Sequence, residues 1–153
     1  MSAAAEFADA TNCHGELERQ GERMIELLHK GISDRVLGSF FQVHSELGPG
    51  YVESVYGNGM EIALTDDGLR VEREVPVCVN FRGRRVGTFR ADMIVESVVL
   101  LEFKAGDRLD PNAEAQLLNY LRGTRLELGF ILHFGPKASF IRRIMTNDRK
   151  VLP

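Results

Sequence analysis

Three ionisable residues are set into two apolar runs of the segment from Arg90 to Lys104, which reads RADMIVESVVLLEFK. Asp92 lies on the first run, and Glu102 and Lys104 lie on the second. Such runs of Val, Ile and Leu are typical of buried strands. An unpaired charge buried there costs several kcal/mol. These side chains therefore either neutralise one another or hold a metal ion, and the fold must accommodate one of these solutions.

Apolar spacing predicts helices before and after this segment. Apolar residues recur every three or four positions over residues 22–47, which indicates one helix ending before Gly48-Pro49-Gly50, with Gly31 as a point where it can bend or break. The same spacing predicts a second helix over residues 52–65 and a third over 111–124.

Alternating and continuous apolar patterns predict five strands. Residues 69–95 alternate and contain Arg82-Gly83 at their centre, which indicates an antiparallel hairpin. Glu96-Ser97 is the expected turn into the next strand, and Pro76 indicates an edge strand or an irregularity. The later strands are expected at 98–103, 129–134 and 140–144. This order predicts an α/β (mixed α+β) fold with a central mixed sheet of about five strands flanked by helices.

The length of 153 residues suits one domain. We expect a flexible leader over residues 1–18, a single domain over 19–147 and a C-terminal tail over 148–153. No apolar run reaches the roughly 18 residues of a membrane span, and the start does not resemble a secretory signal. A cytoplasmic protein without a membrane partner is therefore expected, and its two cysteines are expected to be free thiols.

Charge is distributed unevenly along the chain. Residues 1–67 carry four basic and twelve acidic side chains, a net charge of -8, whereas residues 68–153 carry fifteen basic and ten acidic ones, a net charge of +5. A phosphate-binding surface would therefore come mostly from the second half, although such charges can equally form a solvated face. The candidate phosphate contacts are Arg82, Arg84, Arg85, Arg122, Arg125, Arg142 and Arg143.

The spacing of Glu102 and Lys104 places both on one face of a strand, because side chains two residues apart point the same way. If the strand with Asp92 is its neighbour, the two carboxylates can converge on one hard cation such as Mg²⁺ (or Mn²⁺). Lys104 could then orient a water or stabilise charge on a phosphate. The alternative is an ion pair at the end of the sheet, between Glu102 and Lys104 or between Asp92 and Arg90.

Several motifs together resemble one known family. Gly50-Tyr-Val-Glu53-Ser-Val-Tyr56 matches the motif of the GxxExxY proteins, and RAD, LEFKA, AQLLNYL and LGFILHFG follow in that family's order. The resemblance covers about residues 22–146. That family looks like a compact branch of the PD-(D/E)xK nuclease superfamily, so the resemblance implies a restriction-endonuclease-like core.

The resemblance also implies roles for particular residues. Asp92 and Glu102 would be the metal-binding acids and Lys104 the lysine of the motif. Glu53 would assist metal or water, although a carboxylate in a first helical turn is also favoured by the helix dipole. The expected catalytic set is Glu53, Asp92, Glu102, Lys104 and Gln116, with Asp92, Glu102 and Glu53 on the metal and Tyr120, Arg122 and Arg142 on the substrate. Two positions depart from the family pattern: Ala113 replaces a histidine and His133 an asparagine.

These observations predict a Mg²⁺-dependent nuclease in which metal-activated water attacks a phosphodiester. DNA and RNA are both open as substrates, and a homodimer is possible. The alternative is a catalytically silent nuclease-fold protein that binds nucleic acid or assembles with protein. A hydrolase acting on a different phosphate or on a small molecule is a further alternative.

Overall fold

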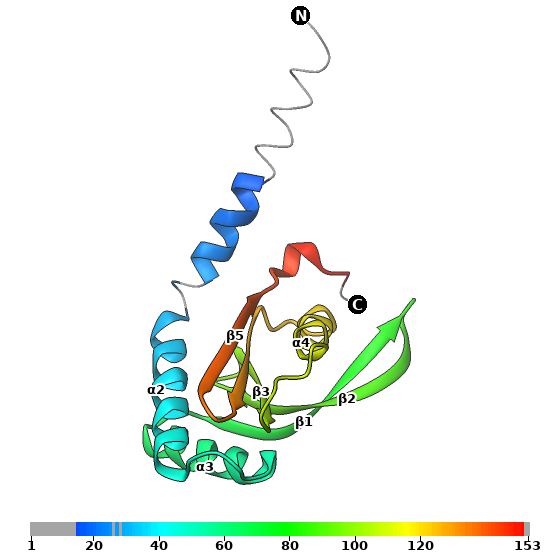
Figure 1. Cartoon of the computed structure of the whole chain (residues 1–153). Coiled ribbons are helices and arrows are strands. Elements are labelled where there is room, and N and C mark those ends of the chain that lie inside the picture. Colours follow the sequence, from blue (N-terminus) through cyan, green and yellow to red (C-terminus); the bar gives the residue numbers. More distant parts are fainter. Residues whose placement is uncertain (1–14, 26, 28, 152–153) are drawn as a thin grey trace, which may run out of the picture.

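The computed structural model describes residues 15–25, 27 and 29–151, and shows a mixed sheet between two helical layers (Figure 1). Residues 15–25 are helical. The elements that follow are α2 (Lys30–Leu47), α3 (Glu53–Asp66), β1 (Val71–Phe81), β2 (Arg84–Val95), β3 (Val99–Ala105), α4 (Ala113–Arg122), β4 (Leu128–Phe134), β5 (Ala138–Ile144) and a short 3₁₀ helix, η1 (Asn147–Arg149).

The sheet has five strands in the order β1-β2-β3-β4-β5. All neighbours are antiparallel except β3 and β4, which are parallel and are connected through α4. The predicted mixed sheet flanked by helices is thus confirmed. β1 is an edge strand, so Pro76 lies where a missing N–H donor is tolerated.

Alternation along β3 divides the core between the two faces. Leu101 and Phe103 pack with α2 and α3, whereas Leu100 packs with Leu117 and Leu121 of α4. Every residue from Val99 to Phe103 is buried, as the continuous apolar run predicts. Glu102 shares the strand face of Leu100 and is buried as well, at 7% exposure.

The predicted helix over residues 22–47 is divided in two. His29, in a turn, separates the helical residues 15–25 from α2, which begins at Lys30. The break lies two residues before Gly31, where the sequence indicated a possible interruption. Residues 1–14 of the expected leader lie outside the described residues, and its residues 15–18 are helical.

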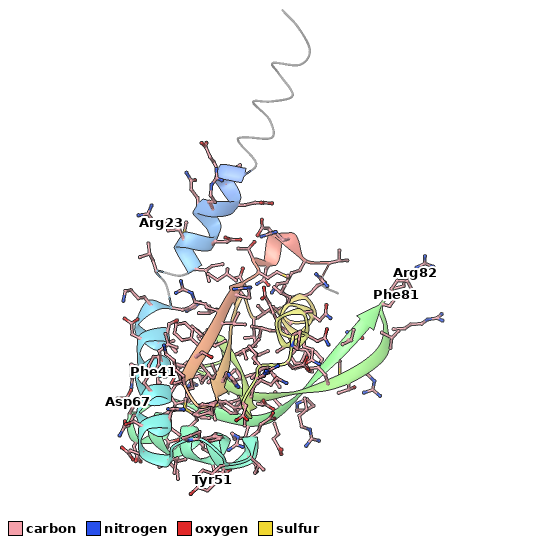
Figure 2. The ribbon with its side chains drawn as sticks, viewed as in Figure 1. Arg23, Phe41, Tyr51, Asp67, Phe81 and Arg82 are labelled. Atoms are coloured by element: carbon pink, nitrogen blue, oxygen red, sulfur yellow. The ribbon has the colours of Figure 1, made fainter. Side chains whose placement is uncertain are left out.

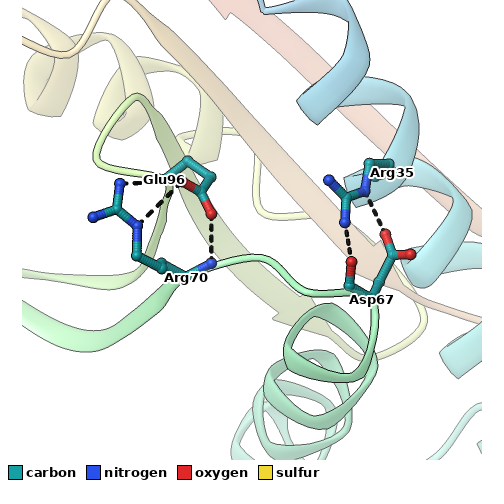
Figure 3. Close-up of polar contacts among 4 residues, drawn as sticks. All are labelled: Arg35, Asp67, Arg70 and Glu96. Atoms are coloured by element: carbon teal, nitrogen blue, oxygen red, sulfur yellow. Dashed lines mark hydrogen bonds and ion pairs between the residues drawn. The ribbon is translucent and has the colours of Figure 1, made fainter.

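Two ion pairs at the surface fix the junctions around the sheet (Figure 3). Arg35 of α2 donates from Nε to Asp67 Oδ2 at 2.6 Å and also donates to the Asp67 carbonyl, which ties the end of α3 to α2. The Arg70 backbone N–H donates to Glu96 Oε1 at 2.6 Å, and the Arg70 guanidinium donates to Glu96 Oε2. The hydrogen bond from the Arg70 backbone N–H contributes most to lowering the pKa of Glu96.

The β2–β3 turn contains the predicted Glu96-Ser97 pair. Both residues have positive φ, 51° and 58°, as in a type I′ turn, and the Val98 N–H donates to the Val95 carbonyl at 3.1 Å. Because Val95 pairs with Val99, residues 96–98 connect the two strands. The contacts between Arg70 and Glu96 therefore hold a conformation that is unfavourable for both residues. Within the described part of the chain, no helix is both long and apolar enough to cross a membrane.

Candidate functional site

β2 and β3 pair over only three residues and then separate. The paired residues are Met93 with Leu101, Ile94 with Leu100, and Val95 with Val99. Beyond them β2 continues alongside β1, whereas β3 continues alongside β4. We call the point of separation the fork, and it is defined by Asp92 on β2 and Glu102 on β3.

At the fork, side-chain carboxylates replace backbone pairing. The Phe103 backbone N–H donates to Asp92 Oδ2 at 2.8 Å, and the Asp92 backbone N–H donates to Glu102 Oε1 at 3.3 Å. Each carboxylate is thus held by the backbone of the opposite strand. The structure brings together the two acids that the sequence predicted as neighbours.

Burial disfavours the ionised form of these two carboxyls. Burial is the largest cause that raises the pKa of Glu102 to about 8, and the charge of Asp92 adds to it; the Asp92 backbone N–H and the Lys104 ammonium act in the opposite direction. Burial also raises the pKa of Asp92, whereas the hydrogen bond from the Phe103 N–H and the charge of Lys104 lower it. A cation at the fork would favour the ionised form of both groups.

Lys104 lies two residues beyond Glu102 and is partly buried. Its charge acts on both carboxyls. Among the described residues no ion pair joins Lys104 to Glu102, and Arg90 pairs with Glu74 at 3.7 Å rather than with Asp92. Neither simple ion pair considered from the sequence therefore forms.

Glu53, the first residue of α3, lies near the fork. It lines a cavity of about 200 Å³ with Ser54, Arg73, Glu74, Asp92 and Phe103, and its charge raises the pKa of Glu102. The residues that the structure describes contain no group of three or more His, Cys, Asp or Glu side chains arranged to hold a metal ion.

Tyr56 explains how α3 presents Glu53. Its buried ring stacks on Phe134, with centroids 4.3 Å apart, and its hydroxyl donates to the Gly48 carbonyl at 2.6 Å. The Tyr51 N–H donates to the same hydroxyl. Tyr56 thus fixes the turn that precedes Glu53. The sequence indicates Tyr56 only as part of a motif, because its partner Phe134 lies 78 positions later in the chain.

The first residues of β1 supply two charges beside Asp92 that sequence reasoning missed. Arg73 lowers the pKa of Asp92 and Glu74 raises it. Glu74 has a φ of 49° and lies between the register pairs Arg73–Met93 and Val75–Ala91, so the ladder is distorted directly opposite Asp92. Arg73 donates to Asn58 and to Glu61 of α3, at 3.1 and 2.9 Å, while its Nε is buried without a partner. Alternation of polar and apolar residues along a strand does not indicate which polar side chains will contact a helix such as α3.

The two predicted α4 residues differ in placement. Tyr120 is partly buried, and its pKa is raised by burial and by the charges of Glu102 and Asp92, so it lies within their electrostatic reach. Its ring stacks on Phe89 with centroids 3.8 Å apart. Gln116, one turn earlier, is exposed, and its side chain makes no hydrogen bond within the described part of the protein.

The two predicted arginine contacts lie on different elements. Arg122 ends α4, where it donates to Asn119 at 2.9 Å and lines a larger cavity with Tyr120 and Phe89. Arg142 is an exposed residue of β5, the edge strand two strands away from β3. The structure therefore groups Arg122 with Tyr120.

The two departures from the family pattern are both buried. His133 lies beside Lys104 in the β3–β4 register, and its Nε2 donates to the Gly106 carbonyl at 2.9 Å, which ties down the loop after Lys104. Because that carbonyl can only accept, Nε2 must carry a hydrogen. The other ring nitrogen, Nδ1, lies 3.3 Å from the Ser139 hydroxyl. Ala113 packs among the apolar residues beneath α4.

Comparison with known proteins gives one family match and one structural match. A family model described as the PD-(D/E)XK nuclease superfamily matches residues 30–144. No curated protein matches the sequence. The crystal structure of SSO0001 matches at 18% identity and a TM-score of 0.40, and the match covers 79% of this chain and 61% of that one. The family match spans three quarters of the chain and includes both strands of the fork, which shows that this protein belongs to the PD-(D/E)XK nuclease superfamily.

Proposed function

We propose that this protein is a metal-dependent nuclease that hydrolyses phosphodiester bonds of nucleic acid, and that it belongs to the GxxExxY branch of the superfamily. The observation that carries the proposal is the pair of the buried Glu102 and the partly buried Asp92, two carboxyls held together at the fork with raised pKa values. Such perturbed pairs cluster at functional sites.

The donors at the fork suit Mg²⁺ or Mn²⁺. These are hard oxygen ligands, and Mg²⁺ is commonly held by one or two carboxylates, with waters and substrate phosphates completing its shell. A site with two protein carboxylates is compatible with the lack of a three-ligand group among the described residues. One oxygen of each carboxylate accepts a backbone N–H, and the other is left for a cation.

Each neighbouring side chain has a role in this proposal. A bound metal ion would supply an activated water and neutralise phosphate charge. Lys104 would donate to that water or to a phosphate oxygen, and Glu53 would hold a water or an outer ligand from α3. Tyr120 would donate its hydroxyl to the substrate and Gln116 would border it. Arg122 and Arg142 would contact phosphates further along the strand.

The proposal is tested by cleavage of single- and double-stranded DNA and RNA with Mg²⁺ or Mn²⁺ and with EDTA. Asp92→Ala and Glu102→Ala are expected to abolish cleavage and to remove the metal-induced rise in melting temperature. Lys104→Ala is expected to lose cleavage while it retains metal binding. Equal cleavage by wild type and Lys104→Ala would identify a contaminating nuclease, and metal binding that survives both acid changes would refute the site.

A silent nuclease-fold binding protein is the second candidate. It is favoured by the lack of a three-ligand group in the described residues and by the exposed position of Gln116. Nucleic-acid binding without cleavage of any substrate in either metal would support this candidate over the nuclease.

A further inference from the structure

β1 and β2 form a two-stranded ribbon that projects from the body of the protein (Figures 1 and 2). The two strands pair from Val71–Val95 as far as Phe81–Arg84, whereas β3 pairs only with the segment of β2 after Asp92. We call residues 76–90 the arm. Most of the arm is exposed, and its outer end contacts no other strand.

The arm carries positive charge only. Residues 76–90 include Arg82, Arg84, Arg85 and Arg90 and contain no Asp or Glu. Arg90, at the base, pairs with Glu74. Within the described chain, the side chains of Arg84 and Arg85 have no hydrogen-bond or ion-pair partner. A surface of this kind is complementary to a polyanion and repels a second copy of itself.

The tip of the arm carries an arginine in a backbone conformation that disfavours any residue with a side chain such as this. Arg82 and Gly83 form the turn with φ values of 49° and 73°, a conformation in which Asn, Asp or Gly is preferred at the first position. An arginine there costs about 1–2 kcal/mol. Its guanidinium lies 5.1 Å from the centre of the exposed Phe81 ring. The fold does not require a positive charge at this position.

We propose that the arm binds duplex DNA by entering the major groove, and this proposal rests on nucleic acid being the substrate. The B-form major groove is about 12 Å wide and admits a two-stranded β-ribbon, whereas that of A-form RNA is too narrow. Neighbouring strand residues point to opposite faces, so Arg84 and Arg85 present positive charge on both faces of the arm, from which their long side chains can reach backbone phosphates. Phe81 and Val86, both exposed, can contact thymine methyl groups.

The length of the arm sets the extent of the contact. Arg84 lies eight positions before Asp92 on β2, which corresponds to about 26 Å along a strand. At about 3.4 Å per base pair, the tip contacts the duplex about eight base pairs from the fork.

The test is the salt dependence of DNA binding by the full-length protein carrying Glu102→Ala, in EDTA. Arg84→Ala/Arg85→Ala is expected to weaken binding to a duplex roughly tenfold or more, and to reduce the slope of log K against log salt by about 1.8. Arg84→Lys/Arg85→Lys is expected to retain the slope. The matched control is Arg19→Ala/Arg23→Ala, which removes two exposed arginines from the N-terminal helical segment and is expected to change neither quantity.

A slope in Arg84→Ala/Arg85→Ala equal to that of its parent would refute the proposal. So would an RNA duplex that is bound as tightly as DNA with the same dependence on Arg84 and Arg85. Loss of a dimer in sedimentation equilibrium, with the DNA slope unchanged, would assign the arm to self-association instead. Because binding is measured without metal in a variant that cannot cut, a failure of the nuclease proposal leaves this result intact.

Discussion

Replacing Glu102 with glutamine should make the stability of the protein less sensitive to alkaline pH. The pKa of Glu102 is raised from 4.5 to about 8, so the folded state keeps a proton that the unfolded state releases above about pH 4.5. In the wild type this group therefore destabilises the folded state increasingly as pH rises from about 4.5 to about 8. Glutamine keeps the shape and can still accept the Asp92 N–H, but it has no proton to lose.

The size of the effect follows from the same pKa. Each pH unit between the two pKa values corresponds to about 1.36 kcal/mol, so the wild type should lose roughly 3 kcal/mol of unfolding free energy between about pH 5 and pH 8 through this group. Glu102→Gln should lack that loss. Urea unfolding monitored by far-UV circular dichroism, in EDTA, measures the difference, and no tryptophan signal is available in this chain.

The exposed Glu72 of β1 offers a matched control, since Glu72→Gln also removes one carboxylate but not from the fork. Its pH profile should follow that of the wild type. If Glu102→Gln and Glu72→Gln lose stability equally between about pH 5 and pH 8, the fork does not hold a reluctant carboxyl, and the electrostatic argument for a cation there is lost.

Two further changes test the packing that positions the fork. Tyr56→Phe should lower the free energy of unfolding by about 1–2 kcal/mol because the Gly48 carbonyl loses its donor, whereas Tyr51→Phe, at an exposed ring, should change it by less than about 0.5 kcal/mol. Gly129→Ala should cost about 1–3 kcal/mol because the new Cβ would lie 2.7 Å from Leu117 Cδ1, while Gly87→Ala meets no atom within 4 Å. Urea unfolding checks both, and equal losses within either pair would contradict the packing described.

Local patterns were sufficient for most of the fold. The alternation over residues 69–95 and the Arg82-Gly83 turn predicted a hairpin that the structure shows as β1 and β2. The two apolar runs around Glu96-Ser97 predicted neighbouring strands. The observed register pairs Val95 with Val99, and its continuation places Asp92 opposite Glu102. These features depend on neighbours in sequence, which is why the sequence revealed them.

Contacts between distant segments were not accessible in this way. The stacking of Tyr56 on Phe134 and the bonds from Arg73 to Asn58 and Glu61 join residues that only the folded chain brings together. The exposure of Gln116 depends on how α4 turns its faces over the sheet, and spacing within the helix fixes only which residues share a face. The sequence thus predicted the members of the fork better than the residues that surround it.

The fork shows why the acids occur at this place in the sheet and not elsewhere. Where β2 leaves β3, two backbone N–H groups, those of Asp92 and Phe103, lose their partners in the ladder and need acceptors. A carboxylate from each opposite strand satisfies one of them, so separation of the strands creates the requirement that the acids meet. The same separation leaves each carboxylate with one oxygen directed away from the backbone contact, in a buried setting that opposes its charge. A divalent cation bound there would favour the ionised form of both carboxyls without closing the strands, which is why our proposal places the metal at the fork.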